Sequence, residues 1–146
     1  MTLGEKELAM NPSDPGDTDL VTLPSAHSAT KTVERLKSLL SGKKIKLFAD
    51  VDHAAGAQQV GLSMRPTRLL IFGNPQAGTP LMQSRQTIGL DLPLRVLVWE
   101  DEAGKAWLTY HRPELLAKRH HVLGHDEAFK SLSAGLAALV RAAASP

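Results

Sequence analysis

The sequence predicts an α+β fold in which a mixed β-sheet carries helices packed mainly on one face. Two observations indicate this class. Apolar segments of strand length alternate with segments whose apolar residues recur at helical spacing, and two late strand segments flank a short Gly-containing loop that is typical of a β-hairpin. The expected order of elements is β-α-β-α-β-α-β-β-α-α. A length of 146 residues fits one domain of this kind.

The predicted domain begins with a strand and an amphipathic helix. Residues Leu20–Leu23 form a short apolar strand that ends at Pro24, because proline cannot donate to a strand ladder. Ser28 or Thr30 is suited to cap the next helix, and Gly42 to end it. Between them, apolar residues recur at spacings of three and four: Val33, Leu36, Leu39 and Leu40.

A second strand and a short helix follow. Segment Ile45–Asp52 alternates with period two, which predicts a strand with one polar face that includes Phe48. Asp52 or His53 is suited to cap a helix that runs from Ala54 to about residue 61. The apolar face of the strand is predicted to consist of Ile45, Leu47, Ala49 and Val51.

The third strand is predicted to be covered on both faces, since Leu69–Phe72 is continuously apolar. Residues 73–78 then form an irregular loop rich in small residues. Thr79 and Pro80 match an N-cap followed by a proline in the first helical position, which predicts that a helix begins there. That helix would carry Leu81, Met82 and Ile88.

The C-terminal part contains the hairpin and two helices. Segments Leu94–Trp99 and Ala106–His111 are strands around a Gly-containing loop, and Pro113–Arg119 is a short helix with proline in its first turn. A final helix begins near Asp126. Its apolar face is predicted to contain Phe129, Leu132, Leu136, Leu139, Val140 and Ala143.

Composition excludes several classes of protein. The chain has no cysteine, which excludes disulfide frameworks, thiolate metal sites and a cysteine nucleophile. No run of about 18 apolar residues is present, so we expect no contact with a membrane. The N-terminus lacks the basic start and apolar stretch of a secretory signal, so we expect a cytoplasmic location.

Charge is spread unevenly along the chain. Residues 1–30 carry five acidic residues and one basic residue, whereas the remainder carries 16 basic and 10 acidic residues. We interpret residues 1–18 as an acidic, flexible tail and residues 19–146 as a single domain, because segment Asn11–Asp17 combines turn formers with little to bury. The basic excess of the remainder is too mild and too dispersed to predict nucleic-acid binding.

One block of sequence resembles a known family. It comprises Leu47–Ala57, Arg65–Met82 and Leu90–Leu94, with the unusual string Phe-Gly-Asn-Pro followed by Gly-Thr-Pro-Leu-Met. This block is similar to the bacterial domain of unknown function 302 family over about residues 20–125. The resemblance implies a compact α+β domain that tends to pair into dimers, and it implies no activity. The acidic tail and the His120-His121 pair lie outside the pattern.

The loop after the third strand is the strongest candidate for ligand contact. Its small residues expose backbone amides, and a helix start near Thr79 favours negative charge. We therefore expect a small, anionic molecule to contact Gly73, Asn74, Pro75, Gly78 and Thr79. The structural alternative is that Asn74-Pro75 simply makes a tight turn, with a cis bond as one option.

Asp50, Asp52 and His53 lie at the end of a predicted strand and could form an acid/base group. A carboxylate would orient His53, whose side chain suits proton transfer near neutral pH. Asp91 could join them if the two segments meet at one end of the sheet. The structural alternative is that Asp52 caps a helix, Asp50 pairs with Arg or Lys, and Asp91 binds nearby backbone.

Three C-terminal histidines suggest a metal site only weakly. His121 and His125 would share a helix face, but Gly124 lies between them and no glutamate completes a zinc-protease motif. We predict no metal site and no cofactor. Metal sensing through His120, His121 and His125 is kept as the least favoured alternative.

The primary hypothesis is a homodimeric binding or interaction domain. Leu97, Trp99 and Trp107 lie opposite the other apolar residues of the hairpin, so both faces of the sheet need cover and a second copy could supply it. The ligand pocket is expected between the Asp50–His53 segment and the Gly73–Pro80 loop. The alternative is a small enzyme that uses His53 as general acid/base with Asp50, Asp52 or Asp91. No standard catalytic motif decides whether the protein is an enzyme.

Overall fold

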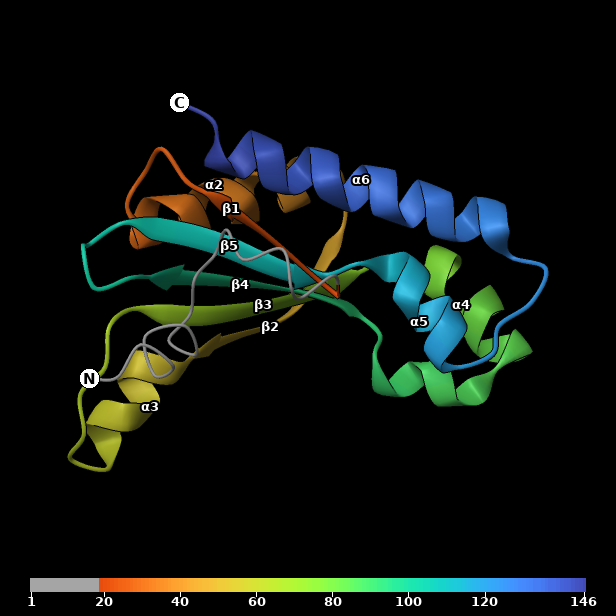
Figure 1. Ribbon diagram of the computed structural model, residues 1–146, viewed down its shortest axis with the longest axis horizontal. Helices are drawn as coiled ribbons and strands as arrows, with labels where there is room; N and C mark the ends of the chain where they lie inside the picture. Colours follow the sequence, from red (N-terminus) through yellow and green to blue (C-terminus); the bar gives the residue numbers. More distant parts are fainter. Residues whose placement is uncertain (1–18) are drawn as a thin grey trace, which may run out of the picture.

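The computed structural model describes residues 19–146, so the predicted acidic tail lies outside the described residues. Five strands form one sheet in the order β1-β5-β4-β3-β2 (Figure 1). Their bounds are β1 Leu20–Pro24, β2 Lys46–Asp52, β3 Thr67–Gly73, β4 Leu94–Glu100 and β5 Ala106–His111.

The predicted α+β class and the order of elements are confirmed, but the sheet is not mixed. All four pairs of neighbouring strands are antiparallel. The two strands joined through the first helix, β1 and β2, lie at opposite edges of the sheet. Each remaining connection returns the chain beside the strand it has just left, so no parallel neighbours arise.

Helices lie on one face of the sheet and at its two ends (Figure 1). Helices α2 and α6 cover one face, α3 lies at one end, and α4 and α5 lie at the other. Their bounds are α2 Ala29–Gly42, α3 His53–Gln59, α4 Pro75–Ser84, α5 Pro113–Arg119 and α6 Asp126–Ala144, with a short 3-10 helix η1 at Gln86–Leu90. Within residues 19–146, no helix combines the length and hydrophobicity that crossing a bilayer requires.

The main core lies between the sheet and helices α2 and α6. Ser28 caps α2 as predicted, because its hydroxyl accepts a hydrogen bond from the Lys31 amide at 3.1 Å. Arg35 then fixes α2 to α6 by donating to the carbonyls of Ala142 and Ala143, at 2.8 and 3.0 Å. The fully buried side chains of this core include Val33, Leu36, Leu40, Leu70, Val96, Val98, Leu108 and Val140.

A smaller apolar cluster holds α4, η1, α5 and the start of α6 together at the end of the sheet. It consists of Leu81, Ile88, Leu116, Val122 and Phe129. Leu81 is the buried residue of α4 and Ile88 that of η1, and both are fully buried, so each element is anchored by one side chain. This anchoring fixes the position of α4 relative to the end of β3.

The predicted apolar face of β2 is wrong beyond Leu47. A register shift between Leu47 and Ala49 pairs Leu47 with Phe72 but Ala49 with Ile71. Since Phe72 faces the core and Ile71 faces away from it, Ala49 and Val51 lie on the face opposite Leu47. The irregularity is a β-bulge, which adds a residue to one strand and reverses the alternation after it.

The second face of the sheet carries apolar side chains without a described helix packed along it (Figure 1). The strand register places Leu69, Leu97, Trp99 and Trp107 on this face, as predicted for the last three. The two tryptophan rings stack with centroids 6.2 Å apart. We call this surface the open sheet face.

Candidate functional site

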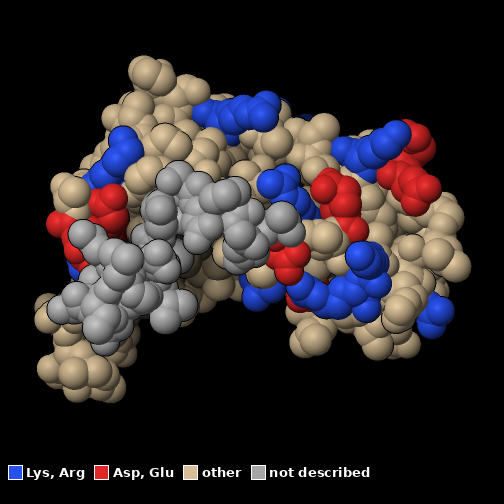
Figure 2. Space-filling model, in the orientation of Figure 1, with Lys and Arg blue, Asp and Glu red and all other residues tan. Residues whose placement is uncertain are grey.

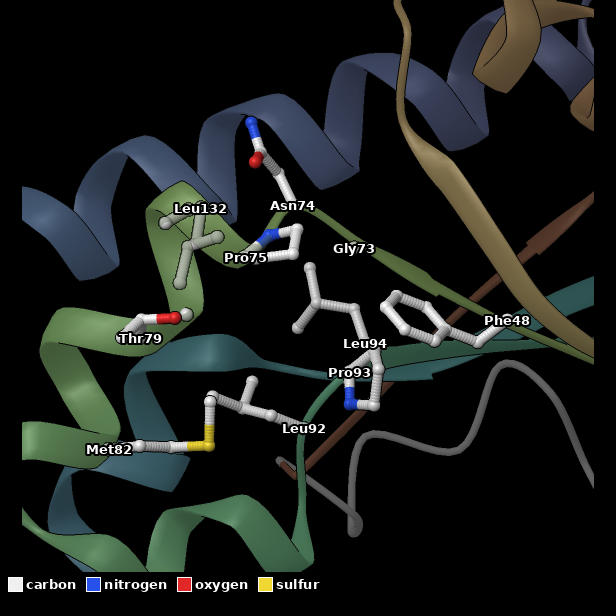
Figure 3. Close-up of a pocket in the computed structure, with 12 residues that line it drawn as sticks. Phe48, Gly73, Asn74, Pro75, Thr79, Met82, Leu92, Pro93, Leu94 and Leu132 are labelled. Atoms are coloured by element: carbon white, nitrogen blue, oxygen red, sulfur yellow. The ribbon is translucent and has the colours of Figure 1, made fainter.

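The five predicted ligand contacts lie around one pocket at the end of the sheet. Gly73, Asn74, Pro75, Gly78 and Thr79 all line a cavity of about 280 Å³ (Figure 3). Gly73 ends β3, Asn74 caps α4, and the other three belong to the first turns of α4. We call this cavity the α4 pocket.

The helix at this pocket begins one turn earlier than predicted. Helix α4 begins at Pro75, and Thr79 and Pro80 lie inside it. Asn74 followed by Pro75 is itself an N-cap with proline in the first position, and its side-chain oxygen accepts a hydrogen bond from the Gln76 amide at 2.9 Å. Among the described residues the cis peptide bond is Leu92–Pro93, so Asn74–Pro75 is trans.

The first amides of α4 are already satisfied by Asn74. Its carbonyl accepts hydrogen bonds from the amides of Ala77 and Gly78, at 2.9 and 3.0 Å, and its side chain accepts from Gln76. Pro75 has no amide proton. The helix start therefore offers no group of free N–H donors, and the reason for expecting an anion at this position is lost.

Apolar side chains from several elements complete the α4 pocket. Figure 3 shows Phe48, Met82, Leu92 and Leu94 around the same space. They come from β2, α4, the segment after η1, and β4, and Leu132 of α6 also contributes. Among the described residues, neither an acidic nor a basic one lines the cavity. The pocket is thus suited to an apolar group.

Two glycines shape the pocket in different ways. A β-carbon at Gly73 would lie 3.2 Å from the β-carbon of Pro93, so glycine permits a close approach between the end of β3 and the segment before β4. A β-carbon at Gly78 would meet Leu92 at 3.7 Å and Met82 at 3.9 Å, which is ordinary van der Waals contact. A side chain at position 78 would therefore extend into the pocket without disturbing the backbone.

A second cavity of about 490 Å³ lies on the α6 side of the same turn. It shares Gly73, Asn74, Ala77, Leu94 and Leu132 with the α4 pocket. Its other walls include core residues of β3 and α6, and Lys43 lies at its rim. The turn at Asn74 is therefore flanked by apolar space on both sides.

The predicted pocket between the Asp50–His53 segment and the glycine loop is wrong. In the antiparallel pair of β2 and β3, Asp52 lies opposite Arg68 whereas Gly73 lies opposite Lys46. Gly73 is five positions further along the strand than Arg68, which corresponds to roughly 17 Å. The two segments are at opposite ends of the sheet.

Asp50 pairs with basic residues, as the structural alternative proposed. Its carboxylate accepts hydrogen bonds from Arg68 and lies 2.5 Å from the Lys37 ammonium, so it ties α2 to the edge of the sheet. Burial raises the pKa of the Asp50 carboxyl, but the hydrogen bonds from Arg68 and Lys37 outweigh burial and hold its pKa below the ordinary value. The Asp50 carboxylate is therefore engaged in structural contacts with Arg68 and Lys37.

Asp52 caps α3, and His53 is exposed. The Asp52 carboxylate accepts a hydrogen bond from the Ala55 amide at 2.9 Å. Within residues 19–146, no hydrogen bond or ion pair involves the His53 side chain. As a general base, His53 would need a carboxylate partner and the glycine loop close by. The arrangement gives His53 neither.

Asp91 does orient a histidine, but the histidine is His120. The Asp91 carboxylate lies 2.6 Å from Nε2 of His120, 3.1 Å from Arg119 and 3.5 Å from Arg95. The other ring nitrogen of His120 lies 3.0 Å from the hydroxyl of Thr87. Burial raises the pKa of Asp91, and the hydrogen bonds from His120 and Arg119 more than offset it, so the pKa lies below its ordinary value.

This Asp91 cluster joins the end of η1 to the end of α5. Figure 2 shows acidic and basic side chains side by side on the end of the molecule that holds α4 and α5. The Asp91 side chain is only 9% exposed, whereas those of Arg95 and Arg119 are partly in solvent. The cluster is separate from the α4 pocket, since none of its residues lines that cavity.

Comparison with known proteins identifies the family. A sequence model described as "Domain of unknown function DUF302" matches residues 21–139. The chain belongs to this family. The resemblance predicted from the Phe-Gly-Asn-Pro string is therefore confirmed, and that string is the turn at the α4 pocket.

A solved structure shows the same fold as this DUF302 domain. The "uncharacterized conserved protein DUF302 from Bacillus stearothermophilus" superimposes with a TM-score of 0.70 at 20% sequence identity. The match covers 88% of this chain and 97% of that protein. At this identity the likeness concerns the fold alone.

Curated relatives of this DUF302 domain are longer proteins. "Fluoride-specific ion channel FluC 1" of Brucella suis and of Brucella abortus are each 48% identical over 129 residues. These matches cover 88% of this chain but 51% and 48% of the relatives. The chain thus spans about half the length of the curated relatives it matches.

The described part of the DUF302 domain gives the metal-sensing alternative no support. Among residues 19–146, no three histidine, aspartate or glutamate side chains are grouped to hold a metal ion. His120 is engaged by Asp91 and Thr87. His121 and His125 are not on one continuous helix, because α5 ends at Arg119 and α6 begins at Asp126.

Proposed function

We propose that this DUF302 domain binds a small molecule whose apolar part occupies the α4 pocket. The observation that supports this proposal is a concave, 280 Å³ cavity with an almost wholly apolar lining, at a turn that glycine keeps tight. Ligand sites in proteins are mostly apolar and concave, and a cavity of this size accommodates on the order of nine non-hydrogen atoms at about 30 Å³ each.

Titration of the isotope-labelled chain with 1-octanol tests this proposal. We expect saturable chemical-shift changes at the amides of Gly73, Gly78 and Thr79, with a dissociation constant of about 1 mM, because nine atoms in an apolar site give modest affinity. Triethylene glycol, of similar size but polar, is the control and should leave these amides unchanged. Octanol shifts confined to other regions, or equal responses to both compounds, would contradict the proposal.

We also propose that the domain is a homodimer formed through the open sheet face. The apolar side chains of Leu69, Leu97 and Trp107 on that face are partly exposed, and a second copy could bury them. A two-fold contact between two such faces would be self-complementary, and a stable dimer requires burial of roughly 800 Å² on each copy.

Leu97→Arg is expected to convert the dimer to a monomer, because it places a charge at the centre of the open sheet face. The mass measured by light scattering at micromolar concentration should halve relative to the natural chain. Leu62→Arg is the matched control, since Leu62 is exposed in the segment between α3 and β3 and belongs to no strand of the sheet, and this variant should remain dimeric. A natural chain that is already monomeric would refute the dimer.

A second candidate function concerns fluoride transport. We infer from the names of the Brucella relatives that a domain of this type acts as an accessory to a fluoride channel, since it matches about half of each. The α4 pocket itself is unsuited to fluoride, because its described lining offers neither a basic side chain nor free amides at the start of α4. Removing the matching half from a relative and measuring fluoride tolerance tests this candidate: altered tolerance supports it, and unchanged tolerance contradicts it.

A further inference from the structure

We propose that the ligand of the α4 pocket is a small amphipathic acid whose anionic group pairs with Lys46. This inference rests on the proposed function, and it adds the chemical class of the ligand. The apolar part would lie among Met82, Leu92 and Leu94, and the acidic group would remain at the mouth of the pocket.

Two observations place Lys46 beside the mouth of the pocket. On the sheet it lies directly opposite Gly73, which lines the cavity. Its ammonium nitrogen also lies 4.8 Å from the centroid of the Phe48 ring, and Phe48 lines the cavity while being 45% exposed. Phe48 therefore has one part in the pocket and another in contact with a positive charge.

The charge of Lys46 has no acidic partner among the described residues. The ion pairs of residues 19–146 do not include Lys46. In the part of the chain that the structure describes, no aspartate or glutamate lines the α4 pocket or the neighbouring cavity, whereas Lys43 lines the neighbouring cavity. The polar group favoured at this mouth is therefore an anion.

The position of the charge separates this inference from anion binding at the helix start. The amides at the start of α4 are bonded to Asn74, so the anion is recognised at the edge of the pocket by a side chain. An alkyl chain of about seven carbons fits a cavity of 280 Å³, and a carboxylate at its end then lies outside. Octanoate is the simplest molecule with both properties.

Three probes with the same chain and different head groups test the inference on the full-length protein. In low salt we expect octanoate to bind about threefold more tightly than 1-heptanol, in the range of a partly exposed ion pair, and heptylammonium to bind more weakly than either. Added salt should reduce the preference for octanoate, because the pair is exposed.

Lys46→Gln should remove the preference for octanoate and leave the affinity for 1-heptanol unchanged. Lys105→Gln is the matched control: its ammonium lies 5.6 Å from the Trp107 ring at the opposite end of the sheet, and its loss should leave the preference intact.

Equal affinity of the natural chain for octanoate and 1-heptanol, or a preference that survives in Lys46→Gln, would overturn this inference while leaving the proposed function standing. Failure of all three probes to bind would overturn the proposed function itself.

Discussion

Replacing Gly78 with leucine should abolish binding of apolar ligands while leaving the DUF302 fold intact. Gly78 lies in α4 and lines the pocket, and a β-carbon there meets only Leu92 and Met82 at ordinary contact distances. The rest of a leucine side chain would occupy the space that a ligand needs. Because leucine also favours helix by about 1 kcal/mol over glycine, the variant should be at least as stable as the natural chain.

Gly56→Leu provides the matched control for this experiment. Gly56 lies in α3 at the other end of the sheet, and a β-carbon there meets no atom within 4 Å. The two variants share the same gain in helix propensity, so they differ in the pocket alone. We expect affinity for octanol to fall at least tenfold in Gly78→Leu and to remain unchanged in Gly56→Leu. Undiminished binding by a folded Gly78→Leu protein would place the ligand elsewhere.

Asp91→Asn should destabilise the domain by about 2 kcal/mol at pH 7, because it removes the charge that His120 and Arg119 share in a largely buried position. Urea unfolding measures this difference. Asp126→Asn is the control, since Asp126 is exposed in the first turn of α6 and its loss should cost less than about 1 kcal/mol. Equal losses of stability in the two variants would show that the Asp91 carboxylate contributes no more stability than an exposed carboxylate does.

The effect of Asp91→Asn should depend on pH in a defined direction. The pKa of Asp91 is lower in the folded protein than its ordinary value. The carboxylate therefore contributes stability that is fully present above its unfolded pKa of about 3.9 and is lost as pH falls through the folded pKa. The difference in free energy of unfolding between the natural chain and the variant should thus narrow below about pH 4. A gap that is constant from pH 7 to pH 3 would contradict this linkage.

Local patterns were sufficient to predict most elements of the fold. The hairpin, the helix at Pro113–Arg119 and the start of α6 at Asp126 all agree with the structure, because their caps and spacings are local. The predicted start of α4 was wrong because the sequence offers two pairs of an N-cap residue followed by proline. Asn74-Pro75 is as suitable a helix start as Thr79-Pro80, which lies five residues later.

Relations between distant segments could not be predicted in this way. The bulge at Phe48 interrupts an alternation that reads as regular in sequence, and it turns Ala49 and Val51 to the other face of the sheet. The separation of His53 from Gly73 follows from the antiparallel pairing of β2 and β3, which a pattern of strands and helices does not specify.

Only the part of the candidate site that is local in sequence was predicted. The five residues of the glycine turn are contiguous or nearly so, and their small size identified them. The walls formed by Phe48, Leu92, Leu94 and Leu132 come from segments far apart in the chain. Apolar residues at these positions are indistinguishable in sequence from residues of the core, so only their placement shows that they line a pocket.

A crystal structure of the full chain grown with octanoate tests the central claim most directly. We expect density for an acyl chain among Met82, Leu92 and Leu94, with the carboxylate within about 4 Å of the Lys46 ammonium. A pocket occupied by ordered water alone, with octanoate bound at another surface or absent, would contradict it.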